Sequence, residues 1–323
     1  MKKENLTQLL LIFYLVATFI FLDCTIYFKF TRRLKNRFGS EMGSSSIKLS
    51  EYQPFDEKSK IVKLTLSDDE KFHDGDFLPV LDGATALFPV YSAVFNSLYP
   101  EDACIFDGKD FSPESRLQKR NTSGAFKALN EGTADIIFCA DPSKKQLDAA
   151  KEKGVELCMT PIGFEAFVFL VNEKNPVENL SSEQIKKIYS GKIIRWSEVG
   201  GDKSPISALT RPEGSGSQTA MLAFMGDEKI EPKNNPYMGR SLGYSFRFYV
   251  QGIVESSRIK LLKLDGAYPS KENIRNKSYP AVSNFYAITR SEDKENPSVK
   301  KILDFILSPE GQSLIEKSGY VAL

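Results

Sequence analysis

One stretch predicts the fold and the function of this chain more directly than any other, namely Thr210-Arg211-Pro212-Glu213-Gly214-Ser215-Gly216-Ser217-Gln218-Thr219. An apolar, helix-like run follows it at 220–224. Gly214 and Gly216 lack a Cβ, so the backbone can approach a ligand closely. The first N–H groups of the following helix would carry partial positive charge, and Arg211 would add a planar fork of donors that matches phosphate geometry. The stretch therefore predicts an oxyanion site at a helix N-terminus, although Gly-Ser-Gly-Ser is equally typical of a flexible turn.

Length and composition indicate a globular protein of ordinary character. The 323 residues suffice for two lobes with a good core, and the net charge of +1 gives no electrostatic footprint for nucleic acid. His73 is the only histidine and lies in a polar stretch, which argues against a histidine-based catalytic triad or a histidine-rich metal site. The four cysteines form no C-x-x-C pair. We therefore expect no metal and no cofactor.

The N-terminal region has the properties of a membrane anchor. Residues 9–28 are mostly apolar, and at ~1.5 Å per residue they are long enough to cross a bilayer core. No small-residue cleavage site follows, and the residues before Cys24 lack the small side chain that a lipoprotein signal needs. We therefore predict a short tail at 1–8, an uncleaved transmembrane helix at 9–28 and a polar tether at 29–60.

From residue 61 onward, strand-like and helix-like patterns alternate, which implies a mixed or parallel sheet with helices on its faces. We expect helices at 87–98, 125–131, 145–153, 182–190, 244–249 and 309–318. We expect strands at 134–140, 155–157, 164–171, 206–209 and 281–288.

Three glycine- and hydroxyl-containing turns lie where a predicted helix begins, at 83–85, 122–124 and 214–217. In open α/β sheets, ligands bind beyond the carboxyl ends of strands, at the starts of helices. Each turn alone is ordinary turn chemistry. Together with Arg211 and Asp141, which ends a predicted strand, they favour one shared anion.

These residues, in this order, carry a family resemblance. The motifs are Gly83-Ala84-Thr85, Thr122-Ser123-Gly124, Ala140-Asp141-Pro142, Pro161-Ile162-Gly163, Tyr189-Ser190-Gly191-Lys192-Ile193 with Trp196, and Arg211-Pro212-Glu213-Gly214-Ser215-Gly216-Ser217. Over roughly residues 78–323 the chain resembles the phosphate-binding proteins of bacterial phosphate ABC importers, which belong to the periplasmic-binding-protein superfamily. The resemblance implies a two-lobed α/β fold, with lobe I formed by 61–166 and 284–323 and lobe II by 167–283. Hinge strands are expected near 164–171 and 281–288.

The resemblance also implies which residues hold phosphate. Lobe I would contribute Thr85, the backbone N–H of Ala86, Ser123 and Asp141, and lobe II would contribute Arg211, Ser215, the N–H of Gly216 and Ser217. The family often has threonine where this chain has Ser217. Thr122 and Glu213 would support the site, Thr122 as an adjacent hydroxyl and Glu213 by orienting Arg211.

Asp141 has a particular expected role. Phosphate still carries a proton at neutral pH, and an ionised carboxylate accepts a hydrogen bond from that P–OH. Sulfate has no proton to give, so Asp141 would discriminate against it by about tenfold or more. The alternative interpretation of Asp141 is a helix N-cap or an Asp-Pro turn residue.

The expected function is binding of inorganic phosphate by hinge closure and its delivery to the permease subunits of an ABC importer, with no bond broken. A membrane-tethered phosphate or oxyanion sensor or scavenger is the alternative. A phosphohydrolase is disfavoured, because Ser215 has no histidine to activate it. We expect the binding domain outside the cytoplasm, held to the cell membrane by the N-terminal helix. The basic residues after that helix, between Lys29 and Arg37, would favour the opposite orientation.

Overall fold

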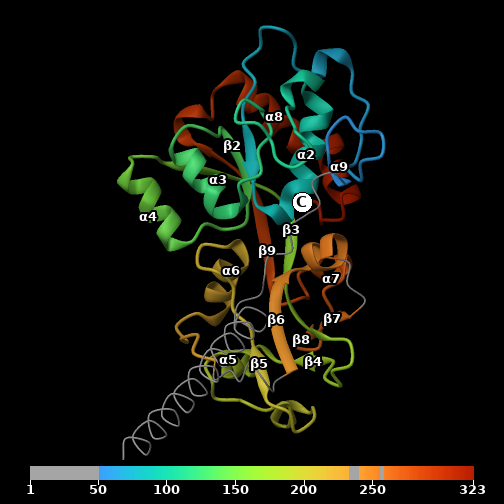
Figure 1. The fold of residues 1–323 in the computed structure, drawn as a ribbon, viewed down its shortest axis with the longest axis vertical. Coiled ribbons are helices and arrows are strands. Elements are labelled where there is room, and N and C mark those ends of the chain that lie inside the picture. Colours follow the sequence, from blue (N-terminus) through green and yellow to red (C-terminus); the bar gives the residue numbers. More distant parts are fainter. Residues whose placement is uncertain (1–50, 233–239, 255–257) are drawn as a thin grey trace, which may run out of the picture.

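The structure is a computed structural model that describes residues 51–232, 240–254 and 258–323 (Figure 1). The predicted anchor at 9–28 and most of the predicted tether lie outside the described residues. Within the described ranges, no helix is both long and apolar enough to cross a membrane. Residues 51–60, the last part of the predicted tether, pack on the folded part: Tyr52 is buried in its core and Phe55 lies against it.

The described chain forms two bodies, one above the other, and strands run between them (Figure 1). The main sheet has the strand order β1-β2-β9-β3-β6-β5, with β7 also paired to β3. These strands are β1 (Leu81–Gly83), β2 (Ile136–Cys139), β3 (Leu157–Asn172), β5 (Ile206–Ala208), β6 (Arg240–Phe246), β7 (Ile259–Leu261) and β9 (Val282–Arg290). A small second sheet pairs β4 (Asn179–Leu180) with β8 (Lys263–Leu264).

Strand β3 belongs to both lobes. Residues 157–166 pair with β9, whereas residues 167–172 pair with β6 and β7. The β3–β9 ladder contains a register shift between Pro161 and Gly163. These two antiparallel strands therefore connect the lobes, as hinge strands would.

Lobe I is a three-layer structure. In β2, Ile136 and Phe138 face one core while Ile137 and Cys139 face another, which is the period of two expected for a strand covered on both faces. The first core lies under α2 (Phe88–Leu98), α8 (Pro297–Leu307) and α9 (Pro309–Lys317). The second lies under α3 (Asn121–Asn130), and α4 (Lys144–Glu152) packs beside α3.

Lobe II has its own core around the lower part of β3 and β6. The α-helices described in this lobe are α5 (Ser182–Tyr189), α6 (Gly216–Met225) and the short α7 (Lys271–Arg275). Trp196 is fully buried in this core. The two-lobed α/β architecture predicted from the sequence is confirmed.

Three predicted elements differ from the observed ones. Helix α3 begins at Asn121, so the turn predicted at 122–124 is in fact the first turn of the helix. The strand predicted at 164–171 and the end of the strand predicted at 155–157 belong to one continuous strand, β3, which begins at Leu157. The helix predicted at 244–249 is wrong in its first half, because residues 240–246 form β6, where alternate aromatic side chains pack on β3.

Candidate functional site

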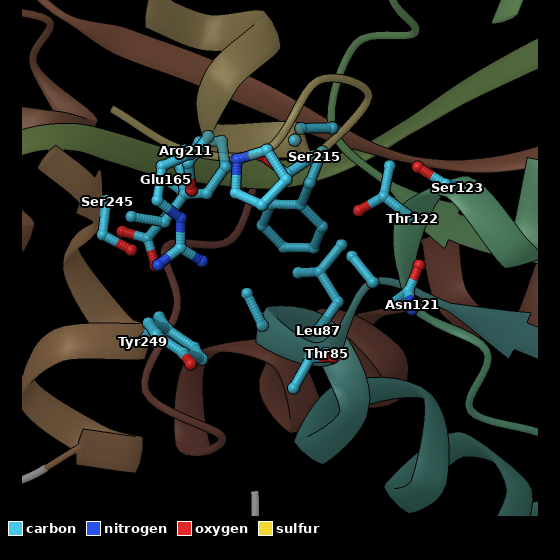
Figure 2. Close-up of a pocket in the computed structure, with 18 of the residues that line it drawn as sticks. Thr85, Leu87, Asn121, Thr122, Ser123, Glu165, Arg211, Ser215, Ser245 and Tyr249 are labelled. Atoms are coloured by element: carbon cyan, nitrogen blue, oxygen red, sulfur yellow. The ribbon is translucent and has the colours of Figure 1, made fainter. Parts of the chain in front are cut away.

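A cavity of about 330 Å³ lies between the lobes, where the turn after β1, the start of α3 and the start of α6 meet. Of the residues predicted for the site, it is lined by Thr85, Ala86, Thr122, Ser123, Arg211, Glu213, Ser215, Gly216 and Ser217. Figure 2 shows side chains from both lobes pointing into this space. Turns that lie far apart in the sequence therefore converge on one cavity.

The N-terminus of α6 forms the lobe II wall. Ser215 is the N-cap of α6, and its Oγ accepts a hydrogen bond from Gln218 N at 3.2 Å. The preceding Gly214 has φ +78°, a conformation that suits glycine. Gly216 and Ser217 occupy the first helical positions, where N–H groups have no partner within the helix and carry partial positive charge. This wall can receive an anion.

Arg211 is held at the same wall by its backbone. Its N–H lies 3.1 Å from Gln218 Oε1 and 3.1 Å from Tyr244 Oη. Its guanidinium group points into the cavity, toward the side on which Glu165 and Ser245 lie (Figure 2). A fixed backbone and a guanidinium directed inward give the cavity a permanent positive charge.

In lobe I, a buried carboxylate joins two of the cavity turns. Asp82 has an exposed fraction of 0%. Its Oδ1 accepts hydrogen bonds from Gly83 N at 2.7 Å and Arg120 N at 2.9 Å, and its Oδ2 accepts one from Arg120 Nη1 at 3.0 Å. Burial raises the pKa of Asp82, and the bonds from Arg120 and Gly83 oppose that rise. Asp82 thus fixes the turn that carries Thr85 against the start of α3.

The two lobes touch at one rim of the cavity. The carbonyl oxygen of Gly214 accepts hydrogen bonds from Ser123 Oγ at 3.0 Å and from Gln146 Nε2 at 3.2 Å. Glu213 was expected to orient Arg211, but its side chain is 77% exposed and lies 3.7 Å from Lys145 of α4. The structure therefore places Glu213 at the exposed rim.

Asp141 is not among the residues that line this cavity. It is exposed and lies in an adjacent depression, where Ser283 Oγ is 3.5 Å from its Oδ2. The two hollows share Ala140, Gly216 and Asn284 in their walls. In this structure Asp141 thus lies next to the predicted site, in a depression that it shares with only one other predicted member, Gly216.

Sequence reasoning missed several residues that line the cavity, among them Lys119, Asn121, Glu165, Ser245 and Tyr249. Glu165 had a recognisable signal, because it is a single acidic residue inside the apolar run 164–171, and a buried charge needs a partner. Burial lowers the pKa of Lys119, while Asp110 and Asp82 oppose this effect. Among the described residues, no group of three or more acidic, histidine or cysteine side chains could hold a metal ion.

The fold has two α/β lobes joined by the strands β3 and β9, with a cavity between the lobes, which is an arrangement typical of ligand-binding proteins. The family model described as "PBP superfamily domain" matches residues 82–310, more than half of the chain. The chain therefore belongs to the PBP superfamily, as the sequence motifs predicted.

Several proteins that are similar to this chain are named for phosphate binding or phosphate transport. The chain is 24% identical over 277 residues to the phosphate-binding protein PstS of Borreliella burgdorferi, covering 78% of this chain and 92% of that protein. It is 26% identical over 258 residues to PstS of Bacillus subtilis, covering 75% and 79%. A putative phosphate ABC transporter substrate-binding protein from Clostridium perfringens, solved with bound phosphate, has a similar fold: the TM-score is 0.59 and the identity 24%, covering 76% of this chain and 99% of that one.

Proposed function

We propose that this chain binds inorganic phosphate in the cavity between its lobes and delivers it to an ABC importer. One observation carries the proposal: the N-terminus of α6, Arg211 and the hydroxyls of lobe I converge on a single cavity. Helix N-termini and guanidinium groups are the donors that suit phosphate. The similar proteins are named phosphate-binding proteins, and this supports phosphate as the ligand.

In the proposed site, both lobes hold the anion. Lobe II contributes Arg211, the Ser215 hydroxyl and the N–H groups of Gly216 and Ser217. Lobe I contributes Thr85, the N–H of Ala86, and Ser123 with Thr122 beside it. Because the ligand contacts both lobes, it stabilises the closed arrangement over an open one, and β3 and β9 are the connections that would bend. No bond is broken in this role.

The location of the domain is part of the proposal. Capture of phosphate for import requires the binding domain outside the cytoplasm, tethered through the predicted helix at 9–28. Protease treatment of intact cells tests this orientation. Digestion of the folded domain supports it, and protection of the domain until the cells are lysed contradicts it.

Titration of the purified full-length chain by isothermal calorimetry tests the ligand. We expect saturable, one-to-one binding of phosphate and much weaker binding of sulfate and molybdate. A chain that binds none of the three would refute the proposed function. Steady release of phosphate from a phosphomonoester would instead indicate an enzyme.

Gln146 offers a prediction about closure. Its Oε1 accepts a hydrogen bond from Ser143 N in a capping box, while its Nε2 donates to Gly214 O of the other lobe. Gln146→Glu keeps the acceptor but removes the donor. One hydrogen bond contributes ~0.5–1.5 kcal/mol, so phosphate affinity should fall about two- to tenfold. Stopped-flow binding should show the loss in a faster dissociation rate.

Gln184 provides the matched control. It forms the same capping box with Ser181, at the start of α5. Gln184→Glu should therefore leave phosphate affinity and dissociation unchanged. Equal effects of the two substitutions would show that the capping box, and not the contact between the lobes, is responsible.

A further inference from the structure

The cavity between the lobes is larger than one phosphate ion. Its volume is about 330 Å³, although the lobes already touch at one rim, where Ser123 Oγ lies 3.0 Å from Gly214 O. Phosphate has the bulk of two to three water molecules, or about 60–90 Å³ at about 30 Å³ for each water molecule. Most of the cavity therefore lies beyond a single bound phosphate.

The two sides of the cavity present different groups. Figure 2 shows Thr122 and Ser123 on one side, Ser245 and Tyr249 on the other, and the guanidinium group of Arg211 between them. The wall also contains apolar surface from buried side chains, namely those of Leu87, Tyr249, Phe285 and Tyr320. Apolar surface offers a charged phosphate oxygen no hydrogen bond, so burying such an oxygen against it is unfavourable. The part of the cavity beyond the anion donors therefore suits a carbon-containing group.

Ser245 supplies a polar group on the side of the cavity away from Thr122 and Ser123. It lies in β6, is 2% exposed, and directs its hydroxyl toward the cavity (Figure 2). Within the part of the chain that the structure describes, this hydroxyl has no hydrogen-bond partner. Buried polar groups are normally hydrogen-bonded. Ser245 therefore marks a position at which a ligand can supply the missing partner.

We propose that the cavity also binds intact phosphomonoesters of small polyhydroxy alcohols, with the phosphate group in the anion site and a hydroxyl of the alcohol at Ser245. The inference rests on the proposed phosphate site and extends its ligands beyond inorganic phosphate. Three phosphate oxygens of such an ester remain for Arg211 and the donors at the start of α6, and the fourth carries the carbon chain. No bond is formed or broken, so the ester leaves the cavity unchanged.

The groups around Ser245 favour a hydroxyl over a bare alkyl chain or a second anion. The Ser245 hydroxyl can donate one hydrogen bond and accept others. Glu165 lines the same side of the cavity, and its ionised carboxylate, which is paired with Arg247, can only accept. A hydroxyl of the alcohol can accept from Ser245 and donate to Glu165, whereas a second phosphate group would be repelled by the carboxylate. The expected alcohol is therefore a neutral polyol.

Calorimetric titration of the full-length chain tests the inference with inorganic phosphate, glycerol 3-phosphate and propyl phosphate, which has the same carbon chain without hydroxyls. We expect glycerol 3-phosphate to bind one-to-one, in competition with inorganic phosphate. It should bind about two- to tenfold more tightly than propyl phosphate, which is the contribution of one hydrogen bond. A phosphate assay of the mixture shows whether the ester itself is the ligand. If released or contaminating phosphate accounts for the whole signal, the inference is wrong.

Two substitutions of Ser245 locate the alcohol. Ser245→Ala removes the hydroxyl, so the affinity for glycerol 3-phosphate should fall about two- to tenfold, to near that of propyl phosphate. Ser245→Val suits a strand and fills part of the space, so this affinity should fall by about tenfold or more. Both variants should bind inorganic phosphate as the wild type does. A folding defect would weaken all the ligands together, so a loss confined to the esters separates a binding role from a structural one.

Ser207→Ala is the matched control. Ser207 is also a buried serine of the lobe II part of the sheet, 5% exposed in β5, but it does not line the cavity. This variant should bind phosphate and both esters with unchanged affinity.

Failure of the inference can be told apart from failure of the proposed function. If the wild type binds inorganic phosphate but neither ester, the inference is wrong and the proposed function stands. If it binds none of these ligands, both fail. If Ser245→Ala binds glycerol 3-phosphate as tightly as the wild type, or loses affinity for inorganic phosphate to the same extent, the alcohol does not lie at Ser245 and the inference is overturned.

Discussion

Replacing Arg211 with alanine should weaken phosphate binding more than any other single substitution in the cavity, by about 100-fold or more. The guanidinium group points into the cavity from a backbone position fixed by Gln218 and Tyr244. Each hydrogen bond from a charged group contributes ~1.5–3 kcal/mol, and a guanidinium can donate two to one phosphate. Calorimetric titration of the Arg211→Ala variant measures the loss.

Two other variants make this result interpretable. Arg211→Lys keeps the charge but loses the planar fork, so its affinity should lie between those of the alanine variant and the wild type. Arg240→Ala removes an arginine of the same lobe that pairs with Asp202 at 2.8 Å and does not line the cavity. It should bind phosphate normally. A folded Arg211→Ala variant that binds phosphate within about tenfold of the wild type would show that the anion site lies elsewhere.

The sequence predicted those helices and strands that are specified by residues close together in the chain. The strand β2 is a short apolar run bounded by turns, and α9 begins at the Ser-Pro-Glu of 308–310, so both could be found without the structure. The start of α6 was predicted from its glycine and serine content, because a capped N-terminus leaves a recognisable pattern. The order of the cavity turns along the chain was enough to indicate the family.

Other features depend on contacts between distant residues and could not be predicted in this way. The sequence pattern predicted two separate strands at 155–157 and 164–171, yet β3 is continuous because β9 pairs along its length with one register shift. The aromatic cluster at 244–249 was interpreted as a helix, but Tyr244 and Phe246 belong to β6, and pairing with β3 holds them in a strand. Short apolar runs are ambiguous for this reason.

The positions of the acidic side chains also depend on distant contacts and could not be predicted from the sequence. The sequence places Glu213 two residues after Arg211 and Asp141 at the end of a strand, and both seemed suited to the site. In the structure, Glu213 pairs with Lys145 at the exposed rim, and Asp141 lies in the adjacent depression. Glu165, which was not predicted for the site, lines the cavity, because the change of partner in β3 brings this position to the boundary between the lobes.

Asp82→Ala should reduce both stability and phosphate affinity. The substitution leaves three donors without their acceptor, namely Gly83 N, Arg120 N and Arg120 Nη1. Breaking a fully buried ion pair costs ~3–5 kcal/mol, but the side chain of Arg120 is 33% exposed, so we expect a loss of ~2–4 kcal/mol in the free energy of unfolding. Urea unfolding monitored by circular dichroism measures it.

Asp82→Asn distinguishes the contribution of the two backbone hydrogen bonds from that of the ion pair with Arg120. Both backbone N–H groups bond to Oδ1, so an asparagine oxygen in that position keeps both bonds. The amide nitrogen would then replace Oδ2 and face Arg120 Nη1, where two donors oppose each other. If the backbone bonds hold the turn of Thr85 against α3, Asp82→Asn should lose stability but keep most of its phosphate affinity, whereas Asp82→Ala should lose at least about tenfold in affinity as well. Equal affinity losses in the two variants would mean that the Arg120 guanidinium, and not the pair of backbone bonds, sets the geometry of the lobe I wall.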